Sequence, residues 1–176
     1  MKRIILFCVI GFLSISLVGS ILHFVYEWSG NNVFVGFFCA VNESVWEHLK
    51  IAIIPMFVWG IIGIWVVKNK NYGFGVFIAL ITVLIVMPVL FYGYTAFTKK
   101  SILAVDIMIF FISIGLGMLF AGLIFIAKPF KNSRILGCIG CVIIALFFAI
   151  FTYFPPKMEL FRDPVNNQYG IIESSK

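Results

Sequence analysis

The chain has 176 residues, of which 62% are hydrophobic and 11% are charged, and its mean hydropathy is +1.13. These values exclude a soluble globular protein and indicate an integral membrane protein, because apolar segments of about 20 residues can cross the hydrocarbon core of a bilayer. The formal charge of +6 would suggest nucleic acid as the partner of a soluble protein, but here membrane topology explains it better, so no nucleic acid is expected.

Apolar stretches at 4–26, 45–67, 72–95, 102–127 and 135–154 predict five transmembrane helices. The first begins like a secretory signal peptide, but its apolar run continues past Ser20 and lacks a small-x-small cleavage site. We therefore expect it to be retained. The predicted fold is an all-α integral membrane protein, with one bundle over residues 1–154. Residues 155–176 are predicted to be an extracytoplasmic tail that could fold over the outer pocket.

The apolar segment 33–41 is too short to cross a bilayer as a helix. It is predicted to be a re-entrant or interfacial segment that ends at Asn42. The alternative is one long, tilted helix over residues 33–67. That helix would place Glu43, Glu47 and Lys50 at membrane depth, where charged groups are costly.

The stretch 42–50 combines two carboxylates, an imidazole, an amine and an indole between apolar neighbours. Ser44 and Glu47 predict a capping box, in which the serine accepts the amide three residues on and the glutamate reaches back. A helix should therefore begin near Val45. Glu47 and His48 then lie in its first turn, where the helix dipole favours a carboxylate and disfavours an imidazolium.

The basic residues favour a topology with the N-terminus inside and the C-terminal tail outside. The inner segments then contain Lys2, Arg3, Lys68, Lys70, Lys128, Lys131 and Arg134, and the short outer segments only Lys50, Lys99 and Lys100. All acidic residues and both histidines are assigned to the outer half: Glu27, Glu43, Glu47, Asp106, Glu159, Asp163, Glu173, His23 and His48. Because carboxylates contribute little to insertion, function is one explanation for their segregation.

The positions of these groups at the outer helix ends predict one outward-facing pocket that binds a ligand. Its expected residues are Glu43, Glu47, His48, Asp106, His23, Glu27, Tyr92 and Asp163. Trp28, Trp46, Tyr92 and Tyr94 could form its aromatic rim. Each part also has a structural interpretation: Asp106 as an interfacial residue near a helix start, His23 with Glu27 as a hydrogen-bonded pair, and 43–50 as a solvated helix start.

The four cysteines lie in apolar runs and do not predict a disulfide framework. The Cys138-x-x-Cys141 pair has no nearby histidine or charge to activate a thiolate, so its members are expected to be core cysteines.

Three functions remain open. The first is binding or transport of a cation or a cationic small molecule at the outward pocket. The second is a membrane-embedded metal-dependent hydrolase for a lipid or peptide, with a divalent metal such as zinc held by His23, Glu47, His48 and Asp106. It ranks second because the chain has no His-Glu-x-x-His pattern. The third is an accessory subunit whose glycines dock on a partner membrane subunit or on a second copy. Membrane lipid is an expected partner in every case.

Two patterns carry a resemblance to a known family. They are NESVWEHLK at 42–50 and, in the tail, LFRDP at 160–164 followed by YGI at 169–171. The chain thereby resembles a family of small, uncharacterised bacterial multi-pass membrane proteins along essentially its whole length. The resemblance implies a location in the bacterial cytoplasmic membrane. It implies no activity and no catalytic residues.

Overall fold

A computed structural model describes residues 1–171, and all regular elements within them are helical. The elements are α1 (Lys2–Trp28), α2 (Val33–Gly36), α3 (Val45–Val66), α4 (Tyr72–Thr98), α5 (Leu103–Ile126), α6 (Ser133–Tyr153) and the 3-10 turn η1 (Glu159–Phe161). Of these, α1, α3, α4, α5 and α6 are long and apolar enough to cross a membrane. The prediction of an all-α protein with five such helices is confirmed.

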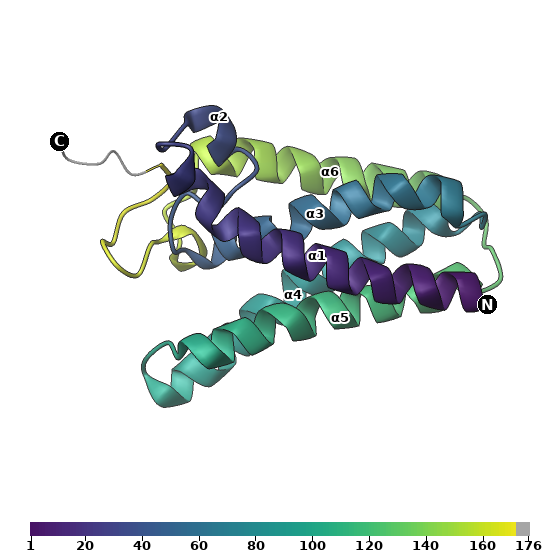
Figure 1. Ribbon diagram of the computed structural model, residues 1–176, viewed down its shortest axis with the longest axis horizontal. Helices are drawn as coiled ribbons and strands as arrows, with labels where there is room; N and C mark the ends of the chain where they lie inside the picture. Colours follow the sequence, from purple (N-terminus) through teal and green to yellow (C-terminus); the bar gives the residue numbers. More distant parts are fainter. Residues whose placement is uncertain (172–176) are drawn as a thin grey trace.

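The five long helices run along the long axis of the molecule (Figure 1). α4 packs against α5, α6 and α3, and α1 packs against α3 and α5. The short α2 and the yellow C-terminal tail lie together at the end opposite the N-terminus (Figure 1). The alternative of one helix over residues 33–67 is wrong, because α2 ends at Gly36 and α3 begins only at Val45.

The alternation of helix directions places every carboxylate side chain of residues 1–171 at one end of the bundle, whereas cations occur at both ends. We call the end with the N-terminus and the α3–α4 and α5–α6 loops the basic end; it carries Lys2, Arg3, Lys68, Lys70, Lys128, Lys131 and Arg134. The opposite, acidic end carries Glu27, Glu43, Glu47, Asp106, Glu159 and Asp163. Glu173 lies outside the described residues. Within residues 1–171, the basic end has no carboxylate side chain.

The centre of the bundle is closely packed and apolar. Ile53, Leu80, Val83 and Ile114 are all completely buried there. On the outside, by contrast, apolar side chains such as Leu17 are widely exposed. A helix bundle with an apolar core and an apolar exterior is suited to lipid on its outer surface.

Gly137 of α6 packs directly on the backbone of α4 at Gly73 and Phe74. A Cβ atom at this position would overlap those backbone atoms, which cannot move aside as a flexible side chain can. Small residues at such crossings let two membrane helices approach closely. The tight approach of α6 to α4 therefore depends on this glycine.

We expect Gly137→Ala to lower the free energy of unfolding by about 1–3 kcal/mol, because the added methyl group forces the two helices apart. Gly93→Ala in α4 is the matched control, since a Cβ at Gly93 meets no atom within 4 Å. Thermal melting of both variants in the same detergent measures the difference. Equal melting temperatures would show that α6 adjusts to the methyl group without cost.

Candidate functional site

The N-terminus of α3 is capped as predicted by Ser44 but not by Glu47. The Ser44 hydroxyl accepts the amide of Glu47 at 3.3 Å. The amide of Ser44 donates instead to Oδ1 of Asn42 at 2.8 Å, so the reciprocal half of the capping box is wrong. Asn42 accepts the Ser44 amide in place of Glu47, because the Glu47 carboxylate pairs with Lys50.

Glu47 and Lys50 form an ion pair that is almost completely shielded from water. Oε2 of Glu47 lies 2.5 Å from Nζ of Lys50, and the side chains are 3% and 0% exposed. The same oxygen accepts the amide of Val41 at 3.0 Å, and Nζ donates to the carbonyl of Gly36 at 2.7 Å. Each of the two charges therefore also has a hydrogen bond to the backbone of the 33–41 segment. A buried ion pair needs such additional hydrogen bonds to offset its loss of contact with water.

This arrangement gives Glu47 and Lys50 a structural role in holding the 33–41 segment against α3. α2 starts that segment, with Oδ1 of Asn32 accepting the amide of Phe34 at 2.9 Å. Cys39 follows and is only 1% exposed. Burial raises the pKa of the Cys39 thiol, so the thiol stays protonated and unreactive while the segment is in place.

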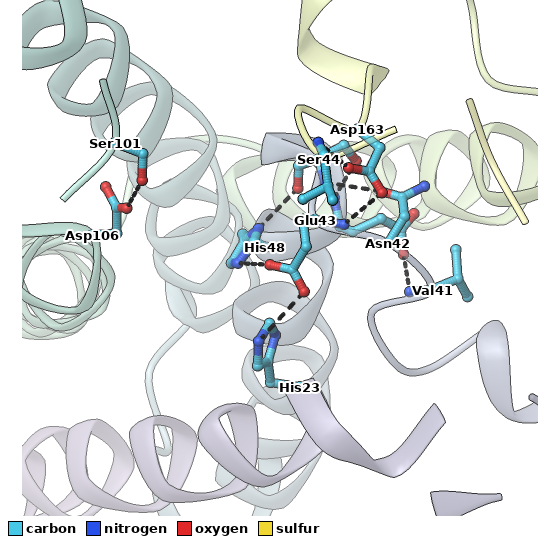
Figure 2. A network of polar contacts seen from close by, with 11 residues as sticks. His23, Val41, Asn42, Glu43, Ser44, His48, Ser101, Asp106 and Asp163 are labelled. Atoms are coloured by element: carbon cyan, nitrogen blue, oxygen red, sulfur yellow. Dashed lines mark hydrogen bonds and ion pairs between the residues drawn. The ribbon is translucent and has the colours of Figure 1, made fainter. Parts of the chain in front are cut away.

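His23, Glu43 and His48 form a separate, partly exposed cluster at the acidic end. Nε2 of His23 lies 3.7 Å from Oε1 of Glu43, and Nε2 of His48 lies 3.6 Å from Oε2. Figure 2 shows both imidazole rings turned toward the Glu43 carboxylate between them. Their side chains are 27%, 50% and 36% exposed for His23, Glu43 and His48. The cluster is thus accessible but anchored on two helices and the turn before α3.

The tautomer of His48 is determined by its neighbour on the helix. Nδ1 of His48 lies 2.9 Å from the carbonyl oxygen of Ser44 (Figure 2). Because a carbonyl oxygen only accepts, Nδ1 must carry the proton. In the neutral ring, the lone pair is therefore on Nε2, which faces Glu43. Metal-binding histidines are commonly oriented by this kind of second hydrogen bond.

The spacing of the three groups suits a small cation. Both His–Glu separations exceed the usual hydrogen-bond length. The three ligand atoms, one from each residue, all lie within 4.8 Å of one another. A tetrahedral zinc ion, at about 2.1 Å from each ligand, separates its ligands by about 3.4 Å. Three protein ligands would leave a fourth position of such an ion for water.

Asp106, Tyr92 and Tyr94 lie outside the His23–Glu43–His48 cluster. Asp106 accepts hydrogen bonds from the hydroxyl of Tyr94 and from Ser101, the latter at 2.5 Å, and thereby closes the α4–α5 turn. Figure 2 shows Asp106 and Ser101 well apart from the histidines. The Tyr92 hydroxyl is buried without a hydrogen-bond partner among residues 1–171. Glu27 is exposed, and within the same residues its carboxylate does not bond to His23.

Asp163 belongs to the folded tail. Its carboxylate accepts the amide of Val165 at 2.7 Å and the side-chain amide of Asn166 at 3.2 Å, and lies 3.5 Å from the amide of Glu43. The side-chain amide of Asn42 donates to the carbonyl of Gly170 at 2.8 Å. These contacts attach the tail to the turn that carries Glu43. The tail thereby helps to position the Glu43 carboxylate.

Trp46 is a core residue, not a rim residue as predicted. It is 7% exposed and stacks on Phe148 of α6 with ring centroids 4.3 Å apart. It also contacts Phe151 and, in the tail, Phe161. Trp28, by contrast, is 70% exposed. An aromatic cage around a cationic ligand is therefore not assembled from these residues.

The structure thus brings together three of the predicted ligand residues, His23, Glu43 and His48, and leaves the others at separate positions. The proposed metal set of the sequence analysis contained Glu47 and Asp106 where the structure places Glu43. Helix geometry could have indicated that Glu47 does not share a ligand with His48, because consecutive residues of a helix point about 100° apart. Asn42 was missed, and nothing in the sequence marks its contact with the tail.

Two comparisons with known proteins give no match: neither a curated protein nor a solved structure is similar to the chain. The third comparison does give one. The sequence profile of a family of unknown function, DUF6512, matches residues 2–171. The match spans all five long helices, the His23–Glu43–His48 cluster and the described part of the tail. The chain therefore belongs to the DUF6512 family of unknown function.

Proposed function

We propose that this protein is a multi-pass membrane protein that binds one divalent cation, with zinc as the best fit, through His23, Glu43 and His48. The observation that carries the proposal is the convergence of two imidazoles and one carboxylate within 4.8 Å on the accessible acidic end. Two histidines with one glutamate form a ligand set that zinc uses in proteins when a fourth position stays open.

We further propose that the acidic end faces the exterior of a bacterial cytoplasmic membrane. The support is the excess of lysine and arginine in the short segments of the basic end, which the positive-inside rule places in the cytoplasm. The 33–41 segment would then be an interfacial segment on the outer side. Its α2 lies beside the C-terminal end of α6, where Tyr153 donates to the carbonyl of Val33 at 3.2 Å.

The geometry favours binding over passage through the membrane. The core between the two ends is formed by apolar side chains such as Met56, Leu80 and Ile114, which offer a cation no ligand. Binding of a cationic small molecule has less support, because Trp46 is buried in the core. The hydrolase and accessory-subunit hypotheses both remain compatible with a bound metal, and the cluster alone favours neither.

We expect purified protein in detergent to retain about one zinc ion per chain after dialysis. Glu43→Gln and His48→Ala should each weaken zinc affinity at least about 100-fold, because losing even an outer hydrogen-bond partner of a metal site costs about 10- to 100-fold. Metal analysis and competition with a chelating dye measure both quantities. Replacement by Co²⁺ should give the intense visible absorption of a tetrahedral site.

Glu27→Gln is the matched control, since Glu27 is an exposed carboxylate one turn from His23 on α1. It should leave zinc affinity unchanged. Equal zinc content in wild-type protein and the Glu43→Gln variant would refute the site. So would a wild-type protein that holds no zinc after dialysis.

A further inference from the structure

A second candidate site lies at the basic end, far from the histidine cluster. A groove of about 450 Å³ opens there between α3, α4 and α6. Its walls include Ile61, Ile64 and Val76, and its lining also includes Lys68, Lys70 and Arg134. The groove therefore combines an apolar channel with three cationic side chains.

The groove lies between α3 and α6 at the basic end, whereas the two helices meet directly at the other end of the bundle. At the acidic end, Trp46 of α3 stacks on Phe148 of α6. At the basic end, each helix packs on α4 instead. α6 does so through Gly137 on Gly73, and α3 through the Tyr72 hydroxyl, which donates to the carbonyl of Gly60 at 2.5 Å. α4 thus forms the floor and the other two helices form the walls.

The loop that carries two of the cations is held firmly in place. The side-chain amide of Asn69 donates to the carbonyl of Phe125 at 2.6 Å. That of Asn71, a residue only 1% exposed, lies within 3.4 Å of the carbonyls of Ile124, Ala127 and Lys128. These contacts tie the α3–α4 loop to the end of α5. Lys68 and Lys70 are therefore positioned by the fold on either side of an anchored asparagine.

The positive charge at the groove has no partner within the described chain. Lys68, Lys70 and Arg134 are exposed, and none makes an ion pair with the carboxylates of residues 1–171, all of which are at the acidic end. Arg134 lies in the first turn of α6, where the helix dipole adds further positive potential. The site is complementary to an anion attached to an apolar chain.

We propose that this groove binds one anionic phospholipid, with its phosphate at Lys68, Lys70 and Arg134 and an acyl chain along Ile61, Ile64 and Val76. Its volume falls in the range of small-molecule sites. Basic pockets between transmembrane helices recognise anionic lipid head groups. The apolar walls distinguish such a lipid from free phosphate. The inference does not depend on the proposed metal site.

The test is lipid exchange on purified wild-type protein, measured by native mass spectrometry with phosphatidylglycerol and phosphatidylcholine of identical acyl chains. We expect wild-type protein to retain phosphatidylglycerol preferentially. The double variant Lys68→Gln/Arg134→Gln should reduce that preference about 30-fold, given the contribution of each cation near a lipid surface. The control variant Lys99→Gln/Lys100→Gln removes two exposed cations at the acidic end and should retain the preference for phosphatidylglycerol.

A second variant tests the apolar part of the groove. Ile64→Trp keeps all three cations but fills the channel, and it should displace phosphatidylglycerol, whereas Ile112→Trp on the exposed face of α5 should not. Glycerol phosphate, which has the anion without the chains, should not compete. Equal retention of both lipids by wild-type protein, an equal loss in both double variants, or full competition by glycerol phosphate would overturn the proposal.

Discussion

Lys50→Met is expected to lower the free energy of unfolding by about 3–5 kcal/mol. The substitution leaves the Glu47 carboxylate buried without its counter-ion, and removal of one partner of a buried ion pair is strongly destabilising. It also removes the hydrogen bond that Lys50 donates to the carbonyl of Gly36. Denaturation by increasing SDS in mixed micelles, followed by circular dichroism, measures the loss.

The double variant Glu47→Leu/Lys50→Met provides the decisive comparison. It removes both charges at once, so it should be more stable than Lys50→Met alone, although the amide of Val41 still loses its partner. The coupling between the two side chains is the difference between the loss in the double variant and the summed losses of Glu47→Leu and Lys50→Met alone. If the double variant were as unstable as the sum of the two single variants, the pair would be two independent contacts.

The reactivity of Cys39 reports whether the Glu47–Lys50 ion pair holds the 33–41 segment in place. In a background with Cys8, Cys138 and Cys141 replaced by alanine, its buried thiol should react slowly with a water-soluble maleimide. Lys50→Met should accelerate the reaction, because the 33–41 segment is then held less firmly. Unchanged labelling would show that the ion pair stabilises α3 without holding that segment.

The five long apolar helices could be predicted from the sequence because each is a long apolar run bounded by polar residues. That signal depends only on local composition, and it located the start of α3 at Val45 through the cap at Ser44. The gathering of the carboxylates at one end followed from the same alternation. These features require no knowledge of how the helices pack.

The partners within the acidic end could not be predicted, because they depend on packing between distant segments. Glu47 looked like a ligand beside His48, yet its carboxylate turns inward to Lys50. Glu43 precedes the helix, and its amide lies near Asp163 of the tail. The helix register excludes some pairs, but only the fold brings Glu43 between His23 and His48.

Trp46→Ala should be as damaging as loss of the ion pair, at about 3–5 kcal/mol of unfolding free energy. Its indole fills the space between α3, α6 and the tail, where it contacts Phe148 and Phe161 at centroid distances of 4.3 and 4.7 Å. Alanine leaves a cavity between α3, α6 and η1, and small movements of these elements do not fill it. The same SDS titration measures the effect, and Trp65→Ala, at a site 71% exposed, should cost little.

Trp46→Phe separates packing from hydrogen bonding at this position. Nε1 of Trp46 has no hydrogen-bond partner within residues 1–171, so a phenyl ring that keeps part of the stacking should cost less than alanine does. A phenylalanine variant as unstable as the alanine variant would mean that the indole NH, rather than the stack, joins the tail to α3. Because the tail contacts the turn that carries Glu43, loss of this packing should also weaken zinc binding, which ties the stability of the core to the proposed site.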